Sequence, residues 1–200
     1  MNKKIAVGLG VVVAIIAVYF AIQSGIFNNK DRVVEDSLVV NEEYSFSFNY
    51  LAGEDGYHLA ELNAGGSVLQ SYILVVQDSL TAYQENNADI APPTMSIFVF
   101  DLPDSEEIEG QDQPGRVTRL QNWAISNQGL TSYDRIFGTP EIIELDGVKA
   151  LHYDTDGSYQ QSIYLASYRG YIYMFVGQHE RPTDTIKKDF ESLIQTVRFE

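Results

Sequence analysis

The last third of the chain is a succession of apolar runs separated by short turn-forming dipeptides, and this pattern constrains the fold most strongly. Turns are predicted at Asp146-Gly147, Asp156-Gly157 and Arg169-Gly170. Dipeptides of this kind between runs rich in Val, Ile, Tyr and Phe are typical of β-hairpins. Pairing across the first turn places Glu144 opposite Lys149, which is a favourable opposite-charge pair. We therefore predict three consecutive antiparallel hairpins.

Both faces of the third hairpin are apolar. Pairing across its turn puts Leu165 opposite Met174 on one face and Tyr164 opposite Phe175 on the other. An antiparallel sheet with one face in water would alternate apolar and polar residues, so both faces of this sheet need cover. A helix predicted over residues 183–196 supplies part of that cover. Its apolar stripe consists of Ile186, Phe190, Leu193, Ile194 and Val197. The expected fold class is α+β, with helices on both faces of an antiparallel β-sheet in an α/β/α sandwich.

The first half of the chain supplies the remaining elements of one domain, which is predicted over residues 42–200. Strands are expected over residues 44–50, 58–63, 69–76 and 95–100, and helices over residues 80–86 and 116–127. Residues 28–41 are rich in charged and polar side chains and are interpreted as a tether.

Residues 1–27 are predicted to be a single transmembrane anchor that precedes this domain. Residues 5–22 carry no charged or strongly polar side chain, and the apolar stretch continues to Phe27. At about 1.5 Å per residue, it reaches across the roughly 30 Å of a hydrocarbon core. Lys3 and Lys4 favour a cytoplasmic N-terminus, so the domain is expected on the extracytoplasmic side. The alternative is a cleaved signal peptide, for which the usual Ala-x-Ala motif is missing.

Small residues form one stripe of the predicted anchor, and such a stripe lets two helices approach closely. They are Ala6, Gly10, Ala14, Ala17 and Ala21. A homodimer through this stripe is one prediction, and the alternative is the ordinary abundance of small residues in membrane helices.

Negative charge dominates the rest of the chain. All 28 acidic residues but only 10 of the 13 basic ones follow position 30, so residues 31–200 carry a net charge of −18. Such a surface repels phosphate backbones, and nucleic acid is not an expected partner. The chain has no cysteine, which excludes disulfides, thiolate nucleophiles and zinc–thiolate sites.

An acidic loop is the candidate metal site. Its carboxylates belong to Asp101, Asp104, Glu106, Glu107, Glu109 and Asp112, of which the last five are candidate ligands. Ca²⁺ takes six to eight oxygen ligands, although the ligand pattern of an EF-hand is absent here. A solvated charged loop is the alternative. On the helix that follows, Arg116 and Arg119 share one face, where they either bind an anion or partner or pair with Glu106 and Glu107.

No catalytic motif is recognisable. The chain lacks both the Gly-x-Ser-x-Gly pattern and a phosphate-binding loop. Its three histidines, His58, His152 and His179, do not have metal-ligand spacing and are interpreted as hydrogen-bonded strand residues. No cofactor other than calcium is expected.

The order of these features resembles the PsbP-like family, which is named for an extrinsic subunit of photosystem II. The resemblance covers residues 42–199 and rests on an aromatic opening strand, a helix with one tryptophan, and an aromatic ending. The residues are Tyr44, Phe46, Phe48, Tyr50, Trp123, Gly147, Ala150, Tyr171, Tyr173, Phe190, Leu193 and Phe199. Leu51 is a departure, because the family commonly has proline there. The resemblance implies a fold, and no photosystem role is carried over.

These observations predict a membrane-tethered, non-catalytic extracytoplasmic domain that binds or assists an envelope protein or complex. Two alternatives stay open at this point. One is a calcium-responsive acidic surface domain, and the other is an enzyme whose site forms from residues distant in sequence.

Overall fold

The computed structural model describes residues 35–53, 56–62, 67–86, 91–102 and 113–200. The predicted anchor and its stripe of small residues lie outside these ranges. Within them, no helix is both long enough and apolar enough to cross a membrane.

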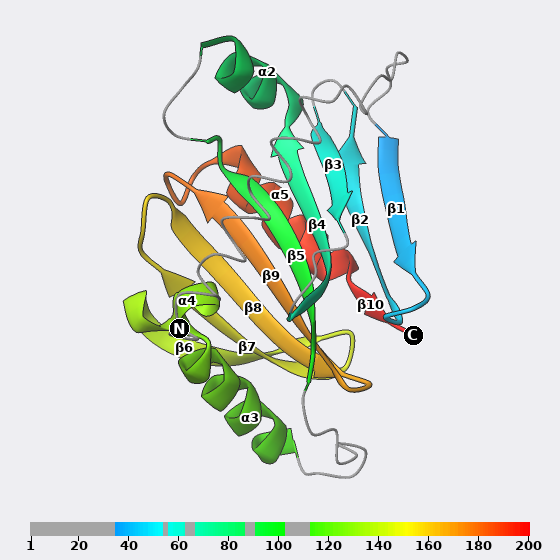
Figure 1. The fold of residues 1–200 in the computed structure, drawn as a ribbon, viewed down its shortest axis with the longest axis vertical. Coiled ribbons are helices and arrows are strands. Elements are labelled where there is room, and N and C mark those ends of the chain that lie inside the picture. The colour runs from blue at the N-terminus through cyan, green and yellow to red at the C-terminus, as the bar shows by residue number, and fades with distance from the viewer. Residues whose placement is uncertain (1–34, 54–55, 63–66, 87–90, 103–112) are drawn as a thin grey trace.

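The described residues form one ten-stranded sheet (Figure 1). The strand order is β1-β2-β3-β4-β5-β9-β8-β7-β6, and β10 pairs with β2. The pairings are antiparallel except for a single parallel contact between β2 and β3, at Ala52 and Tyr57. The strands are β1 (Glu35–Asn41), β2 (Phe46–Ala52), β3 (Tyr57–Leu62), β4 (Val68–Val76), β5 (Thr94–Asp101), β6 (Ile136–Leu145), β7 (Val148–Thr155), β8 (Gln160–Tyr168), β9 (Tyr171–His179) and β10 (Arg198–Phe199).

Two helices cover opposite faces of the sheet (Figure 1). Helix α3 (Gln113–Ser126) lies on one face and α5 (Thr185–Thr196) on the other. Alternation along β9 proves this arrangement, since Ile172 packs in the α3-side core and Tyr173 in the α5-side core. The other described helices are α2 (Gln77–Asn86), α4 (Gln128–Thr131) and the 3-10 turn η1 (Tyr133–Arg135). The predicted antiparallel sheet between helices is confirmed.

The aromatic opening strand lies inside the core on the α5 side. Phe46 and Phe48 are 1% and 0% exposed. The ring of Phe46 meets those of Tyr72 and Tyr173 edge-on, with centroids 5.8 and 5.3 Å away. Burying one such ring contributes about 1.5–3 kcal/mol. Strand β2 is thereby held to β4 and β9, which follow it along the chain.

The predicted register of the C-terminal hairpins is confirmed at two turns. Leu145 pairs with Val148, and Lys149 Nζ lies 3.0 Å from Glu144 Oε2. Asp146 and Gly147 have φ values of 45° and 77°, as a type I′ turn requires. The third hairpin pairs Tyr168 with Tyr171. The second hairpin has a longer loop than the Asp156-Gly157 dipeptide suggests, because Thr155 pairs with Gln161.

The predicted tether over residues 28–41 is wrong for its second half. Glu35–Asn41 is strand β1, paired along its whole length with β2. Val39 packs against the α5-side core, whereas Leu38 and Val40 on the other side of the strand are exposed. The acidic residues at the start of this segment are uncommon in strands, so the sequence pattern did not predict one here. Pairing with β2 satisfies the hydrogen bonds of its backbone N–H and C=O groups.

Candidate functional site

The residues predicted to form a calcium site are not among those that the structure describes. Asp104, Glu106, Glu107, Glu109 and Asp112 all fall between residues 102 and 113. Among the described residues, no group of three or more His, Asp or Glu side chains is arranged to hold a metal ion. The prediction of calcium binding by the acidic loop therefore stays a prediction.

Arg116 and Arg119 lie in the first half of α3, and both side chains are half-buried. Val117 and Leu120 beside them anchor the helix to the sheet. The carboxylates proposed as their partners, Glu106 and Glu107, are outside the described residues. A role of the two arginines in partner binding is untested.

The fold brings together a polar cluster that the sequence did not reveal, made of His152, Asp154, Ser162, Tyr164 and His179. These residues lie on neighbouring strands β7, β8 and β9, on the face covered by α5. Ser162 Oγ donates a hydrogen bond of 2.5 Å to Asp154 Oδ1, and His152 Nε2 lies 3.8 Å from the same oxygen. The Tyr164 ring stacks on the His152 imidazole, with centroids 4.3 Å apart.

Burial controls the protonation of this polar cluster. It lowers the pKa of both His152 and His179 below the ordinary value of histidine. Burial, with the carboxylates of Glu191, Asp154 and Glu141, raises the pKa of Tyr164 to about 12. His179 is 2% exposed, and its Nδ1 has no hydrogen-bond partner among the described residues. Both histidines are therefore neutral at pH 7.

The order of groups in the polar cluster is not that of a serine hydrolase. In a hydrolytic triad, the imidazole stands between the serine and the carboxylate, so that it can take the serine proton. Here Asp154 stands between Ser162 and His152. The hydroxyl donates to a carboxylate, and His152 Nε2 and His179 Nδ1 have no hydrogen-bond partner among the described residues. The geometry supports a structural role beneath α5.

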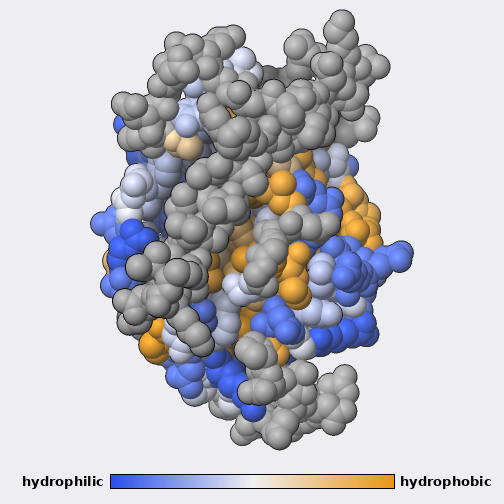
Figure 2. All heavy atoms as spheres, viewed as in Figure 1, coloured by the Kyte–Doolittle hydropathy of each residue, from blue (hydrophilic) through white to orange (hydrophobic). Residues whose placement is uncertain are grey.

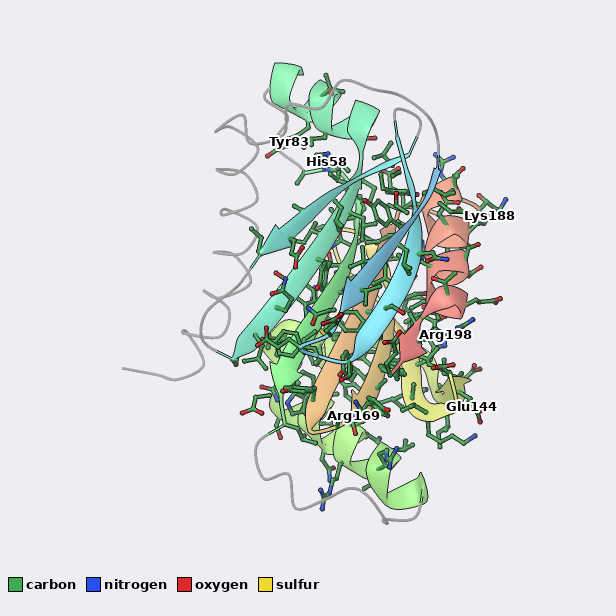
Figure 3. The ribbon with its side chains drawn as sticks, turned by 90° about the vertical axis from the view of Figure 1, so that its right-hand side faces the viewer. His58, Tyr83, Glu144, Arg169, Lys188 and Arg198 are labelled. Atoms are coloured by element: carbon green, nitrogen blue, oxygen red, sulfur yellow. The ribbon has the colours of Figure 1, made fainter. Side chains whose placement is uncertain are left out.

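His58 lies apart from the other two histidines. It is on β3, on the face opposite to α5, because its neighbour Tyr57 belongs to the α5-side core. Figure 3 places it close to α2, at the end of the sheet where Tyr83 also lies. Burial lowers its pKa as well. The fold does not combine it with His152 or His179 into one site.

A cavity of about 400 Å³ opens at the C-terminal end of α3. Its lining includes Phe100, Asp101, Asn122, Trp123, Ser126 and Asn127. The rings of Phe100 and Trp123 have centroids 5.0 Å apart and are inclined by 60°. Asn127 Nδ2 donates a hydrogen bond of 2.8 Å to the Trp123 carbonyl and fixes the end of the helix. We call this cavity the Trp123 pocket.

A row of exposed apolar side chains runs along the edge of the sheet at β1 and β2. Leu38, Val40 and Leu51 are 64%, 50% and 39% exposed, and all three point to the side of the sheet that carries α3. Figure 2 views this side and shows apolar residues interrupting its polar surface. We call Leu38, Val40 and Leu51 the edge row.

Sequence reasoning missed the polar cluster and the Trp123 pocket for different reasons. His152 and Asp154 are two residues apart on one strand, which places them on one face. Ser162 joins them only in the observed register, which the loop after β7 sets. The pocket has one signal in the sequence, a lone tryptophan near the end of an amphipathic helix.

Comparison with known proteins supplies a likeness of fold. No protein-family model matches the sequence, and no curated protein matches it. The solution structure of the cyanobacterial PsbP, CyanoP, from Synechocystis sp. PCC 6803 has a TM-score of 0.47 and 12% identity, covering 88% of this chain and 100% of that one. A crystal structure from Bacteroides thetaiotaomicron has a TM-score of 0.45 and 9% identity, covering 82% of this chain and 48% of that one. Likenesses this distant carry no site residue, family membership or function to this chain.

Proposed function

We propose that this chain is a membrane-tethered, non-catalytic accessory domain that binds a protein of the cell envelope through the free edge of β1. The edge row carries this proposal. Leu38 and Val40 place apolar surface on β1, which among the described residues pairs on one side only, and Leu51 lies on the neighbouring strand β2. Soluble proteins usually protect such an edge with charge, proline or a covering loop.

The free edge of β1 offers two kinds of contact to a partner. Its backbone N–H and C=O groups are available to an added strand, and its apolar side chains give that strand something to pack against. An exposed apolar patch bordered by polar residues is typical of a protein-binding surface. The flanking Asp36 is exposed and acidic. A partner strand with apolar and basic residues fits this edge.

The predicted anchor would hold this edge near the membrane. Seven residues separate Phe27 from Glu35, and an extended chain of that length spans at most roughly 25 Å. The partner would then be a membrane protein or an envelope complex at the bilayer surface. The location of the domain outside the cytoplasm is part of the proposal and rests on Lys3 and Lys4.

Capture from native membranes tests the proposed function. Full-length protein is crosslinked mildly, solubilised and purified, as the unchanged chain and as the double variant Leu38→Lys/Val40→Lys. Both side chains are exposed, so the variant should fold, while two lysines should block strand addition. The matched control is Ile142→Lys, since Ile142 is 61% exposed on the opposite edge strand β6.

We expect one recurrent partner with the unchanged chain and with Ile142→Lys, and a loss of about tenfold or more with the double variant. Equal recovery of the partner with all three proteins would mean that the edge row does not bind it. Recovery of no partner, together with saturable turnover of an ester, peptide or glycan by the purified protein, would replace the accessory role with an enzymatic one.

A further inference from the structure

The walls of the Trp123 pocket combine a fixed aromatic ring with oxygen atoms. Phe100 is 2% exposed, packs against the indole of Trp123 and lines the pocket together with it. Trp123 itself is half-buried. Asn122, Ser126 and Asn127 contribute amide and hydroxyl groups from the same stretch of α3 and its end. A volume of about 400 Å³ is within the usual range of small-molecule sites.

The electrostatics of this pocket favour a positive charge. It lies at the C-terminal end of α3, where the aligned peptide dipoles place partial negative charge. The last turn of α3 contains no basic residue to compensate it. No Lys, Arg or His is among the described residues that line the pocket, and Asp101 is part of its wall. The net charge of the whole chain is −15, which adds a field of the same sign.

We propose that the Trp123 pocket binds a small organic ammonium ion. The face of an indole attracts a cation with about 0.5–2 kcal/mol, most strongly for tryptophan among the aromatic residues. The helix end and the amide and hydroxyl oxygens stabilise the same charge. An anion is repelled at this position, and a neutral ligand gains nothing from the field. The inference rests on the proposed function in that it treats the domain as a binding module.

The pocket contains the only tryptophan of the chain, so its fluorescence reports directly on occupancy. Full-length protein in detergent is titrated with choline chloride, with excitation at wavelengths where tyrosine does not absorb. Sodium chloride at equal ionic strength corrects for screening. A second titration uses 3,3-dimethylbutan-1-ol, which has the shape of choline without its charge. A third uses N-acetylglucosamine as a neutral polar ligand.

We expect a saturable change with choline and none with the neutral isostere or the sugar. Ser126→Lys places a like charge in the wall and should weaken choline binding about tenfold or more. Gln121→Lys is the matched control, since Gln121 is exposed on the same helix and does not line the pocket. The affinity of the Gln121→Lys variant for choline should stay within about twofold of that of the unchanged chain, because salt screens the effect of a more distant charge.

Four outcomes would overturn this inference. Equal binding of the neutral isostere would make the pocket merely apolar, and saturable binding of the sugar alone would make it a carbohydrate site. A linear response to choline, or a response unchanged by Ser126→Lys, would mean that choline does not bind there. None of these results affects partner capture through the edge row, so failure here and failure of the proposed function are distinguishable.

Discussion

At Gly177 on β9, the absence of a side chain decides how closely α5 approaches the sheet. A Cβ atom at this position would overlap the ring of Phe190. Phe190 is 1% exposed and belongs to the α5-side core, so it has little room to move. The glycine is therefore required for packing. Its backbone conformation is not the reason, because its φ lies outside the positive range that favours glycine.

Gly177→Ala should lower the free energy of unfolding by about 1–3 kcal/mol, because the extra methyl group must displace a packed ring. Gly129→Ala is the matched control. Gly129 is exposed in α4, and a Cβ there meets no atom within 4 Å. It should leave stability unchanged or raise it by up to about 1 kcal/mol. Urea denaturation of the two variants measures both effects, and a similar loss in both would contradict the packing argument.

Among the elements of the fold, α5 covers the face of the sheet that carries the polar cluster, where Ser162 and His179 are buried and His152 and Asp154 stay partly exposed. His152 is influenced by Asp154, Glu141, Lys187 and Glu191, and His179 by Lys187, Asp154, Asp184 and Glu191. Burial is the largest effect on both, so each folded-state pKa is below that of the unfolded chain. Protonation of either histidine therefore favours the unfolded chain.

Stability should consequently depend on pH in a definite direction. The pKa of histidine in an unfolded chain is about 6.5, whereas His152 and His179 in the folded protein bind a proton only at lower pH. Their contribution is complete above about pH 6.5 and is lost as the pH falls from there towards their folded pKa. His179→Gln should reduce the slope of Tm against pH between about pH 7 and 5.

The control for this prediction is Lys188→Gln. Lys188 is exposed on the outer side of α5 (Figure 3) and is not part of the polar cluster. Its replacement should shift Tm by a constant amount and leave the slope as it is. If His179→Gln has the slope of the unchanged chain, then the buried imidazole of β9 does not limit acid stability.

At the scale of the whole molecule, the negative charge opposes compaction. The net charge is −15 and the pI is about 4.4. Repulsion among exposed carboxylates extends about 30 Å at 0.01 M salt and about 8 Å at 0.15 M. Salt should therefore stabilise this protein without any specific site.

Raising sodium chloride from about 0.01 to 0.15 M should raise Tm by roughly 2–4 °C for each 1 kcal/mol of repulsion removed. Calcium chloride at equal ionic strength separates screening from binding. If calcium chloride raises Tm further than sodium chloride does, and the double variant Glu106→Gln/Glu107→Gln abolishes this extra rise, the predicted calcium site in the acidic loop is supported. Equal shifts in the two salts would contradict it.

The features that could be predicted from the residues alone are those that depend on neighbours along the chain. Asp146-Gly147 and Arg169-Gly170 specify tight turns because the backbone there needs positive φ, and each turn sets the register of its hairpin. The stripe on α5 follows from helical periodicity, and the apolar faces of the third hairpin required helices on both sides.

The pairing of segments that are distant in the sequence is visible only in the folded chain. β5 pairs with β9, so that Met95 lies beside Gly177, and this pairing joins the two halves of the sheet. Residues 35–41 become a strand because β2 is available to pair with them. The polar cluster and the Trp123 pocket likewise combine residues from separate elements. Short-range patterns record propensity and periodicity, whereas strand order depends on which packing buries the most apolar surface, and that is a property of the whole chain.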